Sequence, residues 1–528
     1  MRVLIFHGYL LGGTGSNVYN ARLAAALTGL GHEVHLLCQD RHPERHAFVD
    51  ATGEWEQGTL RVRDRQRAPG EAVRRRCTVY RPDIGGLLPV YVADRYEGIE
   101  ARTFAECSDE EVAAYVDANV AAVRELVELV RPQVALANHL VMGPVILARA
   151  LGGRVPYAVK VHGSALEYTV KRQPERFLDL AREGVAGARA VLVGSRHTAV
   201  SLWEALADPR LEERTRLGPP GVDVARFAPR EPAAAAAGVR GLAASLRASS
   251  AESAQQDETS AFARDAPAAA AALERLDPER DALVAFVGKL IVSKGVDLLI
   301  AAWPLVLERV PRARLAIVGF GAYRRGLERL CGALCAGDLD EARRLACAGR
   351  SLEDESVPAA PLRHLLAFLD GLHGDERERY LAAARALRQR VVFTGRLDHE
   401  ELAELLPACE ALVVPSTFPE AFGMVAAEAA ACGALPISAA HSGLAEVSDA
   451  LGDAVPERAA AWLAFTVDDG AVRALADDLV SWLGADDALR SQTRAGLVAT
   501  VRERWSWDGV ARGVIAAARG ELDGLDRP

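Results

Sequence analysis

The stretch Arg2–Ser16, RVLIFHGYLLGGTGS, decides the fold class. Its first part, Val3–Phe6, is apolar without alternation, which is typical of a strand covered on both sheet faces. The glycine-rich run Gly12–Ser16 follows, and glycine permits backbone angles that β-branched residues resist. Asn17 is suited to cap a helix, and Glu33–Cys38 has the composition of a second strand. The sequence therefore predicts a βαβ unit at the N-terminus.

Two series of buried strands continue this pattern along the chain. We expect strands at residues 134–137, 157–161 and 191–194 with a helix at 109–130, then strands at 282–287, 314–318, 391–394, 411–414 and 435–438 with helices at 296–310 and 423–431. Strands that alternate with helices favour parallel sheets. The expected architecture is α/β, with two Rossmann-like parallel-sheet domains.

The domain boundaries follow from shifts in composition. We expect an N-terminal domain at 1–228, an Ala-rich linker or insertion at 229–281 and a second domain at 282–500. A charged, helical insertion interrupts the second domain at about 331–388, and a last helix occupies 501–528. Trp505 and Trp507 in this tail are expected to be packing anchors.

Composition excludes several classes of function. The chain has 528 residues, half of them hydrophobic and 25% charged, and its formal net charge is −10. A nucleic-acid-binding protein would carry a clustered basic excess, so no nucleic-acid partner is expected. No apolar run approaches the ~18–20 residues of a membrane span. Eight scattered cysteines indicate a reducing compartment, and we expect a cytoplasmic protein.

The strongest chemical signal in the second half is a pair of lysines. The segment Gly288–Gly295, GKLIVSKG, follows an expected strand and precedes a helix. Ligands of open α/β sheets collect at this carboxyl edge of the strands. Lys289 and Lys294 can therefore converge on one polyanion.

A second segment, Pro415–Glu428, also follows a strand. The free amides of a helix that starts near Gly423 suit a phosphate. Glu420 precedes this helix and Glu428 lies within it, roughly 12 Å apart if the residues between them are helical. This separation favours two different roles along an extended ligand. The apolar neighbours of Glu428 predict that its carboxylate has a polar partner.

Signals in the first half are weaker. His162 ends an expected strand beside Gly163, so it is a candidate ligand contact, and Ser195–Arg196 ends the next strand in the same way. The loop around Gly13 is not the dinucleotide fingerprint, because Val18 stands at the third glycine position. The spacing of Cys331, Cys335 and Cys347 matches no zinc signature, and buried thiols are expected there; no metal site is expected.

Taken together, these segments resemble the glycosyltransferase family 4 enzymes, which are retaining transferases of the GT-B fold. The matching pieces are the loop Gly12–Gly15, His162–Gly163, Gly288–Gly295, and Glu420 with Glu428, which is similar to the family's Glu-x7-Glu signature. The resemblance implies two Rossmann-like domains that face each other across a cleft, with the acceptor on the N-terminal side and a nucleotide sugar on the C-terminal side. It also implies that the last helix crosses back onto the first domain.

The resemblance assigns roles in the second domain. Lys289 and Lys294 would hold the donor's diphosphate, in the loop that Gly288 begins. The family usually has arginine at the position of Lys289, and lysine lacks the planar fork for bidentate phosphate contacts. Glu420 would face the donor sugar, and Glu428 would bind the ribose hydroxyls.

Further roles concern backbone amides and the first domain. Gly423, Met424 and Val425 would present amides to phosphate and sugar. His162 would contact the sugar, and Gly13 would let its loop approach donor and acceptor. The implied donor is a nucleoside-diphosphate sugar, and the implied acceptor is a hydroxyl group of a glycan, a polyol or a lipid-linked molecule. No other cofactor and no catalytic metal is implied.

Alternatives remain open at this stage. A glycoside hydrolase or phosphorylase could use Glu420 and Glu428 as an acid/base pair, and a sugar-binding protein of the same fold could lack catalysis. A nicotinamide-dependent dehydrogenase fits the fold but not the glycine pattern. The nucleobase is expected near Gly395–Leu397. The segment Arg61–Arg76 is basic, so it is either a solvated loop or a contact for an anionic acceptor or a membrane surface.

Overall fold

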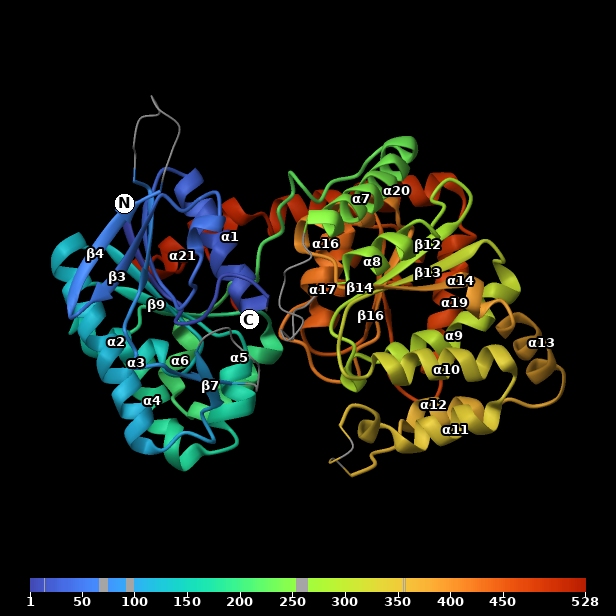
Figure 1. Ribbon diagram of the computed structural model, residues 1–528, viewed down its shortest axis with the longest axis horizontal. Coiled ribbons are helices and arrows are strands. Elements are labelled where there is room, and N and C mark those ends of the chain that lie inside the picture. The colour runs from blue at the N-terminus through green and yellow to red at the C-terminus, as the bar shows by residue number, and fades with distance from the viewer. Residues whose placement is uncertain (14, 66–74, 92–98, 253–264, 355, 357) are drawn as a thin grey trace. The chain divides into compact units, whose positions relative to one another are not determined.

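The computed structural model describes the chain except for residues 14, 66–74, 92–98, 253–264, 355 and 357 (Figure 1). It contains two compact units, one with a mostly parallel sheet and one with a parallel sheet. Over the described residues, unit 1 comprises Met1–Gly221 and Trp505–Pro528. Unit 2 comprises the described residues from Val222 to Arg504.

Unit 1 is built on a sheet of nine strands in the order β11-β10-β9-β8-β1-β2-β5-β3-β4. Its elements are β1 (Arg2–Phe6), α1 (Gly15–Gly29), β2 (Glu33–Leu37), β3 (Ala51–Glu56), β4 (Thr59–Asp64), β5 (Cys77–Arg81), β6 (Leu87–Val90), β7 (Glu100–Thr103), α2 (Asp109–Val130), β8 (Val134–Asn138), α3 (Gly143–Leu151), β9 (Tyr157–Lys160), α4 (Pro174–Ala186), β10 (Ala190–Val193), α5 (Arg196–Leu206), α6 (Pro209–Arg214), β11 (Thr215–Leu217) and α21 (Trp507–Arg519). All neighbours in this sheet are parallel except β3 and β4. The strands β6 and β7 form a separate parallel pair.

Unit 2 has a parallel sheet of six strands in the order β14-β13-β12-β15-β16-β17. Its elements are α7 (Pro232–Glu252), α8 (Ala266–Leu273), β12 (Ala282–Val287), α9 (Val296–Arg309), β13 (Ala313–Val318), α10 (Arg324–Ala336), α11 (Leu339–Ala348), α12 (Arg363–Asp370), α13 (Gly374–Ala384), α14 (Leu387–Arg390), β14 (Val391–Gly395), α15 (His399–Leu405), β15 (Ala411–Val414), α16 (Met424–Ala431), β16 (Leu435–Ala439), α17 (Ser442–Gly452), α18 (Glu457–Ala460), β17 (Ala464–Phe465), α19 (Ala471–Leu483) and α20 (Asp487–Arg504).

Both sheets have the Rossmann strand order. In unit 2 the order of appearance across the sheet is 3-2-1-4-5-6, and the run β5-β2-β1-β8-β9-β10 of unit 1 repeats it. In such sheets the strand order reverses between the first and fourth strands, and ligands bind outside the carboxyl ends there. These switch points lie between β1 and β8 and between β12 and β15.

The predicted βαβ unit is confirmed, but the predicted helix cap is wrong. Helix α1 begins at Gly15, so Asn17 lies inside it. The Asn17 side chain instead donates to the Gly12 carbonyl oxygen at 2.7 Å and accepts from His7 Nε2 at 3.0 Å. A residue that can cap a helix thus ties the glycine loop to the end of β1.

The Ala-rich segment 229–281 is not a linker over its described residues. It forms α7 and α8, which pack against each other and against α15 and β14 of unit 2. Ala236, Val239 and Leu246 are buried on one face of α7. Alanine has the highest helix propensity and little side-chain entropy to lose, so a segment poor in large apolar residues still folds against the sheet.

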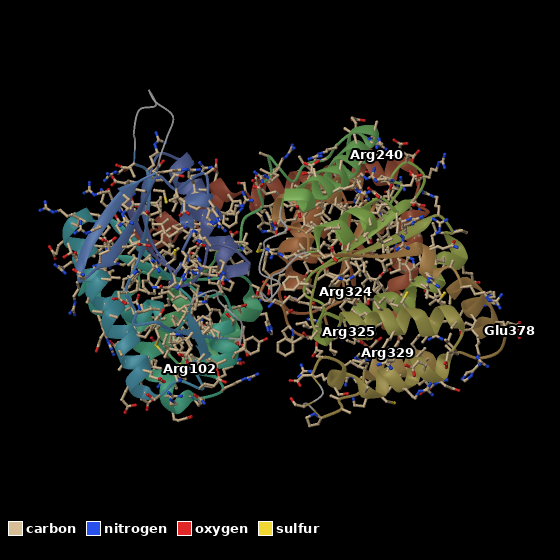
Figure 2. The ribbon with its side chains drawn as sticks, viewed as in Figure 1. Arg102, Arg240, Arg324, Arg325, Arg329 and Glu378 are labelled. Carbon is tan, nitrogen blue, oxygen red and sulfur yellow. The ribbon has the colours of Figure 1, made fainter. Side chains whose placement is uncertain are left out.

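The insertion expected at about 331–388 is helical and comprises the C-terminal part of α10 together with α11, α12, α13 and the start of α14. Charged side chains stand on the surface here, among them Arg324, Arg325 and Arg329 in the part of α10 before the insertion and Glu378 of α13 within it (Figure 2). Its inner surface is apolar: the Tyr380 ring is fully buried, and its hydroxyl donates to the Ala301 carbonyl oxygen at 3.0 Å. The insertion is therefore an integral part of unit 2.

The C-terminal helix α21 completes the core of unit 1. Trp507 is 8% exposed, and its ring meets the Tyr19 ring edge-on at 5.5 Å. A Cβ on Gly221 would lie 2.6 Å from this indole, so glycine is required for the close approach. The expectation that these tryptophans are packing anchors agrees with their burial, since Trp505 is 5% exposed.

We expect Trp507→Ala to lower the free energy of unfolding of unit 1 by about 3–5 kcal/mol, because a large buried side chain leaves a cavity. Urea denaturation followed by far-UV circular dichroism measures this change. The control is Leu129→Ala, since Leu129 is 62% exposed in the same unit and its loss should cost less than ~0.5 kcal/mol. Equal stabilities of the two variants would contradict the anchoring role.

Candidate active site

The predicted site residues of unit 2 follow the strands that flank its switch point. The segment with Lys289 and Lys294 follows β12, and the segment with Glu420 follows β15. Strands β12 and β15 are hydrogen-bonded neighbours. The fold therefore brings together two segments more than one hundred residues apart in sequence.

The two loops contact each other through their backbones. The Thr417 N–H donates to the Ser293 carbonyl oxygen at 2.9 Å. Gly295 ends the 3₁₀ turn Val292–Lys294 at φ +64°, and a Cβ there would lie 2.0 Å from the Pro415 carbonyl oxygen. Only glycine allows this approach, so Gly295 sets how closely the lysine turn lies against the carboxylate loop.

Lys294 and Glu420 form an ion pair. Both contacts recorded for the carboxylate fall on one oxygen, because Ser416 Oγ donates to Glu420 Oε1 at 2.6 Å and Lys294 Nζ donates to the same atom. The two side chains are 29% and 26% exposed, so solvent and ligand can reach them. Oε2 has no contact recorded among the described residues, which leaves it able to accept a hydroxyl proton.

A serine and a histidine fix the backbone of the carboxylate loop. The Glu420 N–H donates to Ser442 Oγ at 2.9 Å, and His441 Nε2 donates to the Ser416 carbonyl oxygen at 2.8 Å. Because Nε2 carries the proton, Nδ1 accepts from the Ser442 hydroxyl at 3.1 Å. Sequence reasoning missed His441 and Ser442, although they follow β16 at the same sheet edge.

Glu428 has the polar partner that its apolar neighbours predicted. The side chain is 2% exposed within α16, and Glu428 Oε1 lies 3.3 Å from His399 Nε2. His399 begins α15 directly after β14 and meets the Phe227 ring edge-on at 4.9 Å. A buried carboxylate needs such a partner. Sequence reasoning also missed His399, whose position after a strand was the available signal.

The remaining predicted residues of unit 2 lie around this cluster. Lys289 is exposed, and among the described residues no ion pair involves its ammonium group. The backbones of Gly288 and Gly319 are in close contact, because a Cβ on Gly319 would lie 1.8 Å from the Gly288 carbonyl oxygen. Gly423 precedes the first turn of α16, which contains Met424 and Val425. Free backbone amides therefore stand at the helix end nearest Glu420.

Unit 1 places three histidines at the carboxyl ends of its strands. His7 follows β1, His139 follows β8 and His162 follows β9. The ring of His139 lies 5.7 Å from that of His7 and 5.0 Å from that of His162. Burial lowers the pKa of His7 to about 4 and holds the pKa of His139 and of His162 well below the usual value. All three rings are therefore neutral near pH 7.

The tautomer of His162 follows from its neighbours. Asn138 Nδ2 donates to the Phe6 carbonyl oxygen at 3.2 Å, so Asn138 Oδ1 is the acceptor that faces His162 Nε2 at 2.9 Å. His162 therefore carries its proton on Nε2 and presents Nδ1 as an acceptor. The Tyr19 ring lies edge-on to His162 at 5.0 Å and links it to Trp507 of α21.

Lys160 supplies a further basic group to this cluster. Its side chain is 2% exposed, and Nζ donates to the Gly218 carbonyl oxygen at 2.6 Å. Burial lowers the pKa of Lys160 to about 7. Gly13 lies in the loop next to His7 at φ +94°, in the left-handed region that glycine tolerates.

Two weaker sequence candidates have structural roles. Ser195 caps α5, because its hydroxyl accepts from the Thr198 N–H at 3.2 Å. Among the described arginines of the segment 61–76, Arg61 and Arg63 contact Glu56 and Arg75 contacts Asp64, whereas the guanidinium groups of Arg65 and Arg76 donate to backbone carbonyl oxygens. The segment therefore offers less free positive charge than its composition indicated, and residues 66–74 lie outside the described part.

The cysteines agree only partly with the prediction of buried thiols. Cys331 is buried, Cys335 is half-buried and Cys347 is exposed. Within the described residues, no three His, Cys, Asp or Glu side chains are grouped so as to hold a metal ion. No helix in the same part of the chain is long and apolar enough to cross a membrane.

Comparisons with known proteins identify the family of the chain. The family model for glycosyl transferases group 1 matches residues 363–492, and the model for a glycosyl transferase 4-like domain matches residues 14–209. The chain belongs to the family 4 type of glycosyltransferases. The match in the second half of this glycosyltransferase includes Glu420 and Glu428, and the match in the first half includes His162.

Two curated relatives are similar to parts of this chain. A D-inositol 3-phosphate glycosyltransferase of Segniliparus rotundus is 28% identical over 49% of this chain and 44% of its own length, and one of Frankia alni is 27% identical over 73% and 74%. The match thus spans less than half of the first relative.

Solved structures support the GT-B fold. The sucrose-phosphate synthase from Thermosynechococcus elongatus has a TM-score of 0.54 at 18% identity, with 99% of both chains covered. Anabaena HepE in complex with UDP and glucose has a TM-score of 0.54 at 16% identity, covering 99% of this glycosyltransferase and 100% of HepE. The expected α/β fold of two Rossmann-like domains is confirmed.

Proposed function

We propose that the chain is a retaining glycosyltransferase, which moves a sugar from a nucleoside-diphosphate sugar to a hydroxyl acceptor. The observation that carries the proposal is the Lys294–Glu420 pair at the switch point of unit 2. Ser416 orients its carboxylate, and the first turn of α16 supplies amides beside it. This cluster combines cations for a phosphate with an acceptor for sugar hydroxyls.

The charges of the reaction match these groups. Breaking the bond between the anomeric carbon and the diphosphate leaves negative charge on a phosphate oxygen and positive character on the sugar. The negative charge on the phosphate oxygen is stabilised by two cations, Lys289 and Lys294, and by the backbone amides of Gly423, Met424 and Val425. Each such preorganised contact is worth roughly 3–4 kcal/mol of barrier. Glu420 Oε2 accepts from a sugar hydroxyl and so fixes the position of the ring.

Retention follows if the acceptor attacks from the face that the diphosphate leaves. The acceptor oxygen bonds to the anomeric carbon as the phosphate oxygen departs with the bonding electron pair. The same phosphate oxygen takes the acceptor's proton, so no side chain needs to form a covalent intermediate. In unit 1, His162 accepts from the donor sugar at Nδ1, and Gly13 lets its loop approach the ligands.

Glu428 and the end of β14 hold the nucleoside. The Glu428 carboxylate, kept in place by His399, accepts from the ribose hydroxyls, and Gly395–Leu397 lies beside the base. HepE is in complex with UDP and glucose, which supports a uridine donor as the first choice. The inositol phosphate transferases among the relatives support a polyol or its phosphate as acceptor. All eight cysteines are free thiols, which supports a cytoplasmic location.

The hydrolase alternative has less support. A hydrolytic acid/base pair needs both carboxyl groups in reach of one glycosidic bond. Glu428 is 2% exposed and faces His399, whereas Glu420 is 26% exposed and faces Lys294. Two carboxylates with different partners and exposure fit two separate tasks.

A panel of nucleotide sugars tests the proposal. UDP-glucose, GDP-mannose and their relatives are incubated with polyol and polyol phosphate acceptors, and the released nucleoside diphosphate is measured. We expect release that depends on the acceptor, a product with the donor's anomeric configuration, and a loss of about 10²–10³-fold in Lys294→Ala. Release without any acceptor would favour a hydrolase, an inverted product would exclude retention, and no release from any donor would favour a binding protein.

A further inference from the structure

A cavity in unit 2 lies between the turn Val292–Lys294 and the helical insertion, and both contribute residues to its lining. Its volume is about 250 Å³, just below the roughly 300–1,000 Å³ of common ligand pockets. The insertion contributes Arg350 and the segment 360–365, and the core contributes Val292, Asp297, Leu298 and Thr417. Among the described residues that line it, none belongs to the set Lys289, Lys294, Glu420 and Glu428.

A buried carboxyl oxygen that has no hydrogen-bond partner among the described residues belongs to a residue that lines this cavity. Asp297 lies in the first turn of α9 and is 3% exposed, and its Oδ1 has no hydrogen-bond partner. Burial raises the pKa of Asp297 to about 7. Such a group can donate as well as accept, so a hydroxyl is a better partner for it than an ammonium ion. An orphaned group of this kind is costly unless a ligand or water satisfies it.

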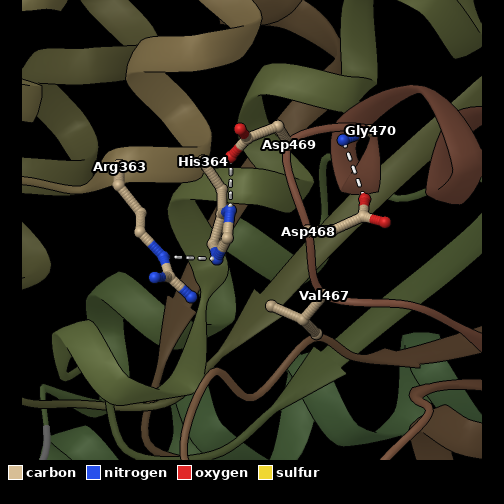
Figure 3. A pocket seen from close by; sticks show the side chains of 6 residues that line it. All are labelled: Arg363, His364, Val467, Asp468, Asp469 and Gly470. Carbon is tan, nitrogen blue, oxygen red and sulfur yellow. Dashed lines mark hydrogen bonds and ion pairs between the residues drawn. The ribbon is translucent and has the colours of Figure 1, made fainter.

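Two arginines line the cavity, Arg350 and Arg363, and Arg363 also lines the neighbouring pocket that Figure 3 shows. Arg350 is exposed, and no contact of its side chain is recorded among the described residues. Arg363 donates from Nε to His364 Nε2 at 3.0 Å, and His364 donates from Nδ1 to Asp469 at 3.0 Å (Figure 3). The terminal nitrogens of Arg363 point away from His364 in this view. Guanidinium forks favour phosphate and carboxylate oxygens.

The cavity also touches both loops of the proposed donor site. Val292 begins the turn that carries Lys294, and its N–H donates to Glu353 of the insertion. Thr417, which lines the cavity, bonds the backbone of Ser293 and lies three residues before Glu420. A ligand there contacts the segments that position the Lys294–Glu420 pair.

We infer that this cavity is a second ligand site, which binds a small phosphorylated sugar or polyol. The hydroxyls face Asp297, and the phosphate faces Arg350 and Arg363. Through Val292 and Thr417, occupancy changes the affinity of the donor site. This last part rests on the proposed function, whereas the binding itself does not.

Calorimetry on the full chain tests the binding with three probes: glucose 6-phosphate, glucose and inorganic phosphate. We expect glucose 6-phosphate to bind at least tenfold more tightly than either of the others. Arg350→Ala and Asp297→Asn should each weaken it at least fivefold. Because Arg350 is exposed, Arg350→Ala should fold normally. It therefore still tests the binding if Asp297→Asn fails to fold. The control is Arg377→Ala, an exposed arginine of α13 outside the cavity.

Three results would overturn the inference: no binding of any probe, binding that Arg350→Ala leaves unchanged, or binding that Lys294→Ala abolishes, which would place the probe in the donor site. Equal affinity for inorganic phosphate would overturn the sugar or polyol part. For the coupling, the Kd of UDP is measured with and without saturating glucose 6-phosphate, and a change of at least threefold is expected in the native chain but not in Arg350→Ala. Failure of UDP to bind would contradict a uridine donor and the coupling to it, but leave the second site standing.

Discussion

Glu420→Gln lowers kcat/KM for glycosyl transfer by about 10²–10³-fold, the usual cost of losing one preorganised electrostatic contact, and leaves UDP affinity unchanged or higher. The reason lies in the pairing of this carboxylate with Lys294. Glutamine keeps the shape of the side chain but not its charge, so the sugar hydroxyl loses a charged acceptor and meets at best a neutral amide oxygen. The Lys294 ammonium then gains freedom to bind the diphosphate. Steady-state kinetics and calorimetry with UDP measure the two effects.

The opposite variant separates the two roles. Lys294→Met should weaken UDP binding as well as turnover, because it removes a cation and leaves Glu420 to repel the phosphates. Glu378→Gln serves as the control, since Glu378 stands exposed on α13 (Figure 2). If Glu420→Gln retains activity within threefold of the native chain, Glu420 does not face the donor sugar.

Gly295→Ala should lower kcat/KM nearly as much as Glu420→Gln does, although Gly295 carries no functional side chain. The added Cβ would lie 2.0 Å from the Pro415 carbonyl oxygen, at a φ of +64° that L-residues adopt at a cost of about 1–3 kcal/mol. The lysine turn must therefore move away from the loop that carries Glu420. We expect kcat/KM to fall about 10²-fold, as misplacement by about 1 Å can cause, together with a lower unfolding temperature.

Gly332→Ala is the matched control for this substitution. Gly332 lies within α10, and a Cβ there would have no atom within 4 Å. Alanine is preferred over glycine in a helix by up to about 1 kcal/mol, so this variant should unfold at the same or a higher temperature with unchanged activity. If both glycine variants behave alike in kinetics and thermal unfolding, the close contact between the two loops does not control the site.

Much of the fold was predictable because it depends on local patterns. Helix α2 and strands β12 and β15 begin and end at the predicted residues. Apolar runs without alternation identify strands covered on both faces, and their carboxyl ends locate the ligand-binding edge. The composition of the segment 229–281 left a linker and an insertion open, because it does not reveal that α7 and α8 pack against α15 and β14.

The site was predictable in its residue types but not in its pairings. The positions of Lys289, Lys294, Glu420 and Glu428 indicated a phosphate site with an extended ligand, the family resemblance implied that the ligand carries a sugar, and the apolar setting of Glu428 indicated a partner for its charge. The partner itself, His399, comes from a different strand end. Likewise, no local pattern predicts that Ser416 and Lys294 share one oxygen of Glu420.

The amino-acid sequence by itself determined the alternation of strands and helices, the parallel sheets and the loops that hold the chemistry, because these depend on neighbours a few residues apart. Only the tertiary structure decided which carboxylate faces which cation, that His162 presents Nδ1, and that the insertion and the core together line a cavity that includes Asp297. Those features depend on side chains distant in sequence that meet when the sheet orders its strands, and the energy of a charge or hydrogen bond depends on the partner it meets.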